Sequence, residues 1–156
     1  MQAKLEVDIQ GFTDCPKYPE NSQDFDLSNL EFELNDQGTI VINGPLTILS
    51  EIASPAPLTT TIERLQRGQW RRSMFSHDVA DFCASLLDPS QIYYSVTSKM
   101  EQQSCPFKPG HTERLVNVTI DVSSYPLTSQ LTGDWRFMTK NGKGNCSMLV
   151  YSLVEQ

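Results

Sequence analysis

The chain has little positive charge and no long apolar run, and these two shortages exclude several classes of function. Its 156 residues include 12 lysines and arginines against 19 aspartates and glutamates, so the net charge is −7. Affinity for nucleic acid depends on cationic contacts to phosphate, and attraction to an anionic membrane surface depends on basic segments. No apolar run approaches the ~20 residues that cross a bilayer. We therefore expect neither a nucleic-acid partner nor a transmembrane helix.

The sequence also lacks the motifs of common enzymes and cofactor-binding domains. It has no phosphate-binding glycine loop, no Walker motif and no GxSxG turn. Ser76-His77-Asp78 contains the residue types of a hydrolase triad, but a triad needs converging side chains from separated positions. His111, beside Gly110, has no evident set of metal ligands. We therefore predict a protein that is not an enzyme and that uses no metal and no cofactor.

Cysteines are few and widely spaced. Cys15, Cys83, Cys105 and Cys146 form no CxxC pair, whereas zinc ligands usually come in close pairs. The spacing indicates two disulfides, and hence an exported protein. The alternative is a cytosolic protein with four free buried thiols. The spacing alone leaves all three pairings open.

Two glycosylation sequons point to the same compartment. Asn117-Val-Thr and Asn145-Cys-Ser both fit the acceptor pattern. Asn117 lies within an expected strand and needs to face water to be modified, whereas Asn145 precedes a cysteine that we expect to be bonded. No signal peptide is visible at Met1, so we expect that a leader was removed and that Met1 was added for expression.

Period-two alternation of apolar and polar residues predicts strands at both ends of the chain. These strands cover residues 5–10, 30–34 and 115–122. Further strands are predicted at 39–42, 46–52, 59–65 and 133–140. The segment 146–154 is apolar on both faces, which is typical of a strand inside a sandwich or beneath helices. Turn residues at 35–38, 67–69 and 141–144 predict hairpins, and Asn43-Gly44-Pro45 predicts a break between two strands. Trp135 and Phe137 are expected on one face of their strand.

The middle of the chain changes to a helical period. Apolar residues at i, i+3, i+4, i+7 and i+8 form one face, and these are Val79, Phe82, Cys83, Leu86 and Leu87. A second helix is predicted to begin at Asp88-Pro89, with Asp88 as its N-cap. Its apolar face consists of Ile92, Tyr93, Val96 and Met100. The prediction is one mostly β domain over residues 1–156: a two-sheet antiparallel sandwich with one or two short inserted helices and two disulfides.

A series of motifs in this part of the chain resembles a known family. Residues 80–86 read Ala-Asp-Phe-Cys-Ala-Ser-Leu, and residues 104–111 read Ser-Cys-Pro-Phe-Lys-Pro-Gly-His. A β-segment with a sequon follows at 116–121, then a proline-bearing loop at 125–127 and a hairpin that begins Gly-Asp-Trp-Arg-Phe at 133–137. This order, over roughly residues 58–154, resembles insect CheB-type chemosensory proteins, which are secreted domains related to the ganglioside activator protein. The first third matches only in its strand pattern.

The resemblance implies a lipid-recognition fold, in which two immunoglobulin-like sheets are splayed into a cup around an apolar cavity. It also implies the pairing of Cys83 with Cys105 and of Cys15 with Cys146. Proteins of this kind are implicated in the detection of lipid pheromones by taste organs. The implied ligand is therefore a cuticular hydrocarbon, a fatty acid, a glycolipid or a similar lipid, and a membrane receptor or channel is the implied further partner.

Large apolar residues are the candidates to line such a cavity. They are Trp70, Phe75, Phe82, Leu86, Ile92, Tyr93, Phe107, Trp135 and Phe137. The simpler interpretation of each is an ordinary core residue, because protein interiors normally pack to crystal-like density. The second hypothesis for the whole protein is a secreted interaction module without a ligand cavity. A cavity of roughly several hundred Å³ favours the carrier, whereas a filled core with an exposed apolar patch favours the module.

A local cluster of arginines stands out in this acidic chain. Arg64, Arg67, Arg71 and Arg72 surround an expected turn. Charge on an exposed hairpin edge protects against aggregation, which is the simpler interpretation. The functional interpretation is a rim for an anionic head group or an acidic partner, because arginine forks bind carboxylate and phosphate.

Overall fold

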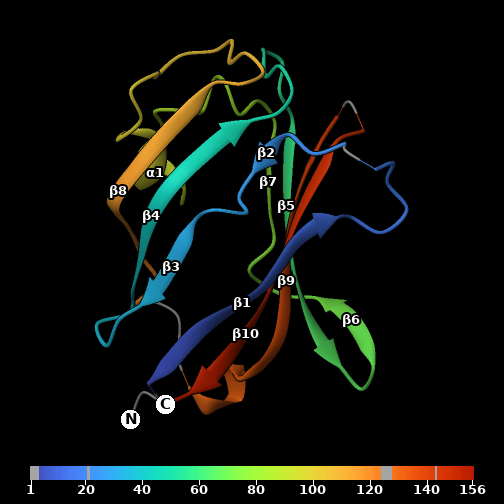
Figure 1. Ribbon diagram of the computed structural model, residues 1–156, viewed down its shortest axis with the longest axis vertical. Coiled ribbons are helices and arrows are strands. Elements are labelled where there is room, and N and C mark those ends of the chain that lie inside the picture. The colour runs from blue at the N-terminus through green and yellow to red at the C-terminus, as the bar shows by residue number, and fades with distance from the viewer. Residues whose placement is uncertain (1–3, 21, 124–127, 143) are drawn as a thin grey trace.

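The computed structural model describes residues 4–20, 22–123, 128–142 and 144–156. They form two antiparallel sheets that face each other, with very little helix (Figure 1). The predicted mostly β, two-sheet architecture is confirmed. The loop predicted at 125–127, Lys143 in the last hairpin turn, and Met1 lie outside the described residues.

The first sheet contains six strands. Five of them follow the order β1-β10-β9-β5-β6, and β7 pairs with β5 as well. Their bounds are β1 (Leu5–Asp14), β5 (Leu58–Gln66), β6 (Gln69–Arg72), β7 (His77–Val79), β9 (Gly133–Asn141) and β10 (Cys146–Glu155). β6 and β7 pair with opposite ends of β5, and between them Ser73 and Ser76 hydrogen-bond to the backbone of Ile62.

The second sheet contains four strands around a central β4. They are β2 (Phe25–Asp26), β3 (Glu31–Leu34), β4 (Thr39–Ile48) and β8 (Thr112–Asp121). β2 and β3 pair with one edge of β4, and β8 pairs with the other. The predicted β3–β4 hairpin is confirmed: the Asn35 side-chain oxygen accepts the backbone N–H groups of Gln37 and Thr39, both at 3.0 Å.

The predicted break at residues 43–45 is wrong, because β4 runs through it. The pairing of β4 with β8 shifts by a bulge between Ile42 and Gly44. Gly44 has a φ of 119°, and a Cβ built there would lie 2.6 Å from the carbonyl oxygen of Asn29. A glycine at this position therefore lets the strand bend without ending.

The helix predicted over residues 79–87 does not form. Val79 lies in β7 opposite Leu58, and the residues after it form turns. The Asp81 carboxylate accepts the backbone N–H groups of Ala56 at 2.9 Å and Cys83 at 3.0 Å. These bonds attach the segment to the linker before β5 and compete with helical hydrogen bonding.

The second predicted helix shrinks to α1 (Tyr94–Thr97), one short turn, and a 3₁₀ turn η1 (Ser129–Leu131) lies before β9. Asp88 does not cap a helix. Its carboxylate accepts the backbone N–H of Ser90 at 2.9 Å in a local turn. Apolar spacing in this segment therefore reflects packing of an irregular chain on the sheets rather than a helical face.

Strand register shows which side chains face the space between the sheets. The Ser147 hydroxyl accepts the backbone N–H groups of Asp24 and Phe25 beside the second sheet, so the odd-numbered residues of β10 face inward. Their partners on β9 include Trp135 and Phe137, which share a face as predicted. Outward-facing members of these strands pack in a separate cluster around Cys146.

Both disulfides join the pairs that the resemblance implies. Cys15 and Cys146 are bonded with a Cα–Cα distance of 5.9 Å, and Cys83 and Cys105 with 5.7 Å. The first attaches the chain just after β1 to the start of β10. The second closes the irregular segment between β7 and β8.

Candidate functional site

Apolar side chains gather where β4 ends and β5 begins, at the top of Figure 1. The buried members of this cluster are Ile48, Ile52, Phe82, Leu86, Met100 and Phe107. Half-buried Phe25, Leu58 and Tyr93 pack against them. The segment with the Cys83–Cys105 disulfide thus supplies much of the core at this end of the molecule.

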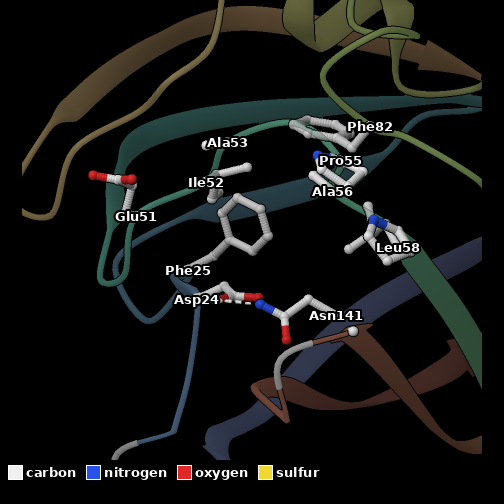
Figure 2. Close-up of a pocket in the computed structure, with 12 residues that line it drawn as sticks. Asp24, Phe25, Glu51, Ile52, Ala53, Pro55, Ala56, Leu58, Phe82 and Asn141 are labelled. Carbon is white, nitrogen blue, oxygen red and sulfur yellow. Dashed lines mark hydrogen bonds between the residues drawn. The ribbon is translucent and has the colours of Figure 1, made fainter.

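A small pocket opens beside this cluster (Figure 2). Its apolar lining consists of Phe25, Ile52, Ala53, Pro55, Ala56, Pro57, Leu58 and Phe82. The enclosed space is about 30 Å³, which accommodates about one or two water molecules. The volume is well below that of a preformed lipid cavity.

One side of the pocket is polar. Asp24 is 1% exposed, and one of its carboxylate oxygens accepts the Nδ2–H groups of Asn141 at 3.0 Å and Asn145 at 2.9 Å, as well as the Ser50 hydroxyl. Figure 2 shows Asp24 and Asn141 across the pocket from Phe82 and Pro55. Converging donors of this kind make a buried carboxylate tolerable in an apolar setting.

Further along the sandwich, inward-facing aromatic residues are only partly covered. Phe137 and Tyr151 on the first sheet and Phe32 on the second are half-buried. Burial raises the pKa of Tyr151 to about 12. Side chains that face the opposite sheet and still reach water indicate that the two sheets do not cover each other completely.

A second hollow, of about 420 Å³, lies over the ends of β9 and β10. Its lining is Thr132, Gly133, Asp134, Ser152, Leu153, Val154 and Glu155. It is wide and shallow, so it encloses an apolar ligand less well than the pocket between the sheets.

Only one of the predicted cavity residues lines the pocket, and that residue is Phe82. The structure brings Phe82, Leu86, Tyr93 and Phe107 together in one cluster, with the rings of Phe82 and Tyr93 at 5.2 Å. Leu86 and Phe107 are fully covered core residues.

Three further candidates lie on the inner face of the first sheet, away from the pocket. The rings of Phe75 and Trp135 are 6.1 Å apart, and Phe137 follows Trp135 on the same face.

The last two candidates do not face the space between the sheets. Trp70 lies opposite Leu65 on the outer face, where the Arg136 guanidinium stacks on its ring at 4.5 Å. Ile92 is 52% exposed in a turn. The helical pattern that suggested an inward orientation for Ile92 does not apply to the observed chain path.

The predicted arginine rim lies at the far end of β5 from the pocket. Arg64 donates to the backbone carbonyls of Thr132, at 2.7 Å, and Gln130, and its guanidinium lies 5.2 Å from the centre of the Trp135 ring. Arg67, Arg71 and Arg72 are exposed around the turn. From Leu58 at the pocket to the last residue of the nine-residue β5 is roughly 26 Å along the strand.

Sequence reasoning missed most of the pocket. Phe25 and residues 53–57 lie outside the strands predicted from the sequence, and none of them is among the predicted cavity residues. Asp24 and Asn141 were not singled out, because their proximity depends on pairing across the two sheets. The cluster of alanines and prolines before β5 is the one local signal, since such residues leave space that larger side chains fill.

The histidines are part of structural contacts. His111 Nε2 lies 2.6 Å from a carboxylate oxygen of Glu113, which is 2% exposed at the inner face of β8. His77 Nε2 lies 3.0 Å from the Gln91 side-chain oxygen. His77 and Asp78 are successive residues of β7, so their side chains point to opposite faces and form no triad with Ser76.

The two sequons differ in accessibility. Asn117 is exposed on β8, and its backbone N–H donates to the Asn43 side-chain oxygen at 2.7 Å. Asn145 is half-buried, and its Nδ2, the atom that carries a glycan, donates to Asp24 and Ser50.

Within the described parts of the chain, no group of three His, Cys, Asp or Glu side chains is placed to hold a metal ion. None of the described helices has the length and apolar character needed to cross a membrane. No protein-family model matches the chain, and no curated protein does either.

Proposed function

We propose that this protein binds a hydrophobic, lipid-like ligand between its two sheets, and that the pocket beside Phe25 and Phe82 is the entrance. The observation that carries the proposal is an apolar pocket at the end of the space between the sheets. The half-buried inner aromatic residues further along the sandwich support it, because they leave apolar surface that a ligand can cover. Binding consists of burial of apolar ligand surface, with no covalent step.

The pocket is too small for a whole lipid, so binding requires side chains to move. Its 30 Å³ accepts only the end of an alkyl chain, so a longer ligand must displace side chains. Each methylene transferred from water contributes about 0.8 kcal/mol. The half-buried rings of Phe25 and Phe137 have incomplete contacts, and moving them costs less than moving fully packed residues.

The resemblance to insect CheB-type proteins suggests which ligand and which biological role the proposal should include. We infer an extracellular protein that captures a lipid pheromone or a related lipid for chemosensory detection, with a membrane receptor or channel as recipient. Two disulfides and the exposed sequon at Asn117 support export.

A second candidate function is a secreted interaction module. The small enclosed volume favours it, and so do exposed apolar side chains on the irregular part of the chain. Met74 is 86% exposed, Ile92 52% and Leu87 46%. Exposed apolar residues of this kind provide contact area for a protein partner.

Obstruction of the pocket distinguishes the two functions. Ala53 is half-buried in the pocket lining, so Ala53→Trp fills the entrance, whereas Ala80 is exposed elsewhere and Ala80→Trp is the matched control. The assay is displacement of a fluorescent apolar dye by dodecanol, together with native mass spectrometry of the secreted protein.

We expect Ala53→Trp to weaken dye binding at least tenfold and Ala80→Trp to leave it unchanged. A co-purifying lipid in the native protein agrees with the carrier. If the unsubstituted protein neither carries a lipid nor binds the dye, the carrier is refuted and the interaction module remains.

A further inference from the structure

The pocket combines an apolar wall with a polar wall that carries negative charge. Asp24 and Glu51 are among its lining residues. The described lining includes no lysine, arginine or histidine. Lys108 lies near the rim, but its ammonium is 2.6 Å from the Glu51 carboxylate and pairs with it. Among the described residues, the charge that lines the pocket is therefore negative.

The arginines cannot supply the missing positive charge. Arg67, Arg71 and Arg72 lie at the other end of β5, and Arg64 is engaged by two backbone carbonyls. At physiological ionic strength the Debye length is ≈8 Å, which is much shorter than the roughly 26 Å that separates the ends of the strand. An anionic head group in the pocket has no cationic partner among the described residues.

We infer, resting on the proposed function, that the pocket selects amphiphiles with an uncharged, hydrogen-bond-donating head group, such as long-chain alcohols and primary amides, over fatty acid anions. The head group donates to the Asp24 carboxylate, which lines the pocket. A carboxylate head group instead loses its hydration beside Asp24, where the like charge repels it.

The test compares ligands that share one alkyl chain. Dodecanol, dodecanamide, dodecylamine and dodecanoate are titrated at pH 7.5 against the protein loaded with a fluorescent apolar dye. We expect dodecanol and dodecanamide to bind at least tenfold more tightly than dodecanoate, and dodecylamine to bind no more weakly than dodecanol. Equal affinities for dodecanol and dodecanoate overturn the inference while leaving the carrier function intact. Failure of every ligand and of the dye itself refutes the carrier function and the inference together.

Two variants locate the selectivity. Asp24→Asn removes the buried charge and is expected to bring the dodecanol-to-dodecanoate affinity ratio close to one. Glu51→Gln removes an exposed charge at the rim and is expected to change the ratio less than threefold. Circular dichroism checks that each variant is folded. An unchanged ratio in folded Asp24→Asn overturns the assignment.

A pH series gives the same information without a substitution. Lowering the pH protonates dodecanoate, so its affinity is expected to approach that of dodecanol. This arm keeps the inference falsifiable if Asp24→Asn does not fold. A ratio that stays constant as dodecanoate becomes neutral contradicts selection by charge.

Discussion

Replacement of Glu113 by glutamine provides the sharpest test of how the irregular segment is attached to the sandwich. The Glu113 carboxylate accepts the backbone N–H of Glu101 at 2.7 Å and that of Gln102 at 3.1 Å, while His111 Nε2 lies 2.6 Å away. Burial alone would raise the pKa of Glu113. The hydrogen bonds from His111, Glu101 and Gln102 outweigh burial and lower the pKa from its ordinary value of 4.5.

The expected loss follows from these contacts. Hydrogen bonds to a charged group contribute about 1.5–3 kcal/mol each and do not add fully. In Glu113→Gln one acceptor oxygen becomes an NH₂ group that faces an N–H donor, so we expect a loss of about 3 kcal/mol. For a domain of this size that corresponds to a fall in melting temperature of roughly 6–12 °C.

The pH dependence separates the charge from simple misfit. Because the folded-state pKa of Glu113 is lowered, its stabilising contribution is complete above pH 4.5 and is lost as the pH falls through the folded-state pKa. The difference in stability between the native protein and Glu113→Gln should therefore shrink below pH 4.5.

The assay is thermal unfolding followed by circular dichroism from pH 7.5 downward. Glu101→Gln is the matched control, because the Glu101 side chain is exposed and only its backbone contacts Glu113. Equal melting temperatures for Glu113→Gln and the native protein, or a difference independent of pH, would refute the reasoning.

Two further predictions concern the disulfides and Tyr151. In the chain-entropy model, removal of Cys15–Cys146, which spans 131 residues, should lower the free energy of unfolding by about 5 kcal/mol. Removal of Cys83–Cys105, which spans 22 residues, should lower it by about 3 kcal/mol. Urea unfolding of the paired serine variants measures both losses, and the reverse order would contradict the model. Burial raises the pKa of Tyr151 to about 12, so stability should fall as the pH rises from 10.0 to about 12. An ultraviolet absorbance titration should show a late ionisation that is absent from Tyr151→Phe, and an ordinary titration of every tyrosine would show that Tyr151 is not shielded.

Local patterns predicted the sheets well because strands and tight turns have short-range causes. Alternation located β1 and β3, a segment apolar on both faces located β10, and the turn residues after β3 formed the expected hairpin. The continuation of β4 through Gly44 was missed because a glycine and a proline interrupt a strand in isolation, whereas pairing with β8 holds β4 extended on both sides of them.

The same reasoning failed in the segment between β7 and β8, where long-range contacts outweigh local periodicity. Asp81 accepts the N–H of Ala56, and Cys83 is bonded to Cys105. Both contacts fix the chain at points that a regular helix would have to move. Apolar residues at helical spacing predict a helix poorly here, because the core at this end of the sandwich can be filled by side chains from an irregular segment as well as by those from a helix.

The pocket illustrates why a binding site was harder to anticipate than the fold. Large aromatic residues are the natural candidates from sequence, yet Trp70 packs under Arg136 on the outer face and Phe107 is buried completely. Space instead appears beside Ala53 and Ala56, where side chains are too small to fill the gap between two sheets. A residue that lines a pocket is therefore often small, and the residue that gives the pocket its polarity, Asp24, is recognisable only after pairing brings Asn141 and Asn145 to it. The chemistry of this site is thus a product of topology, and for that reason the ligand series is a stronger test than substitution of any single aromatic residue.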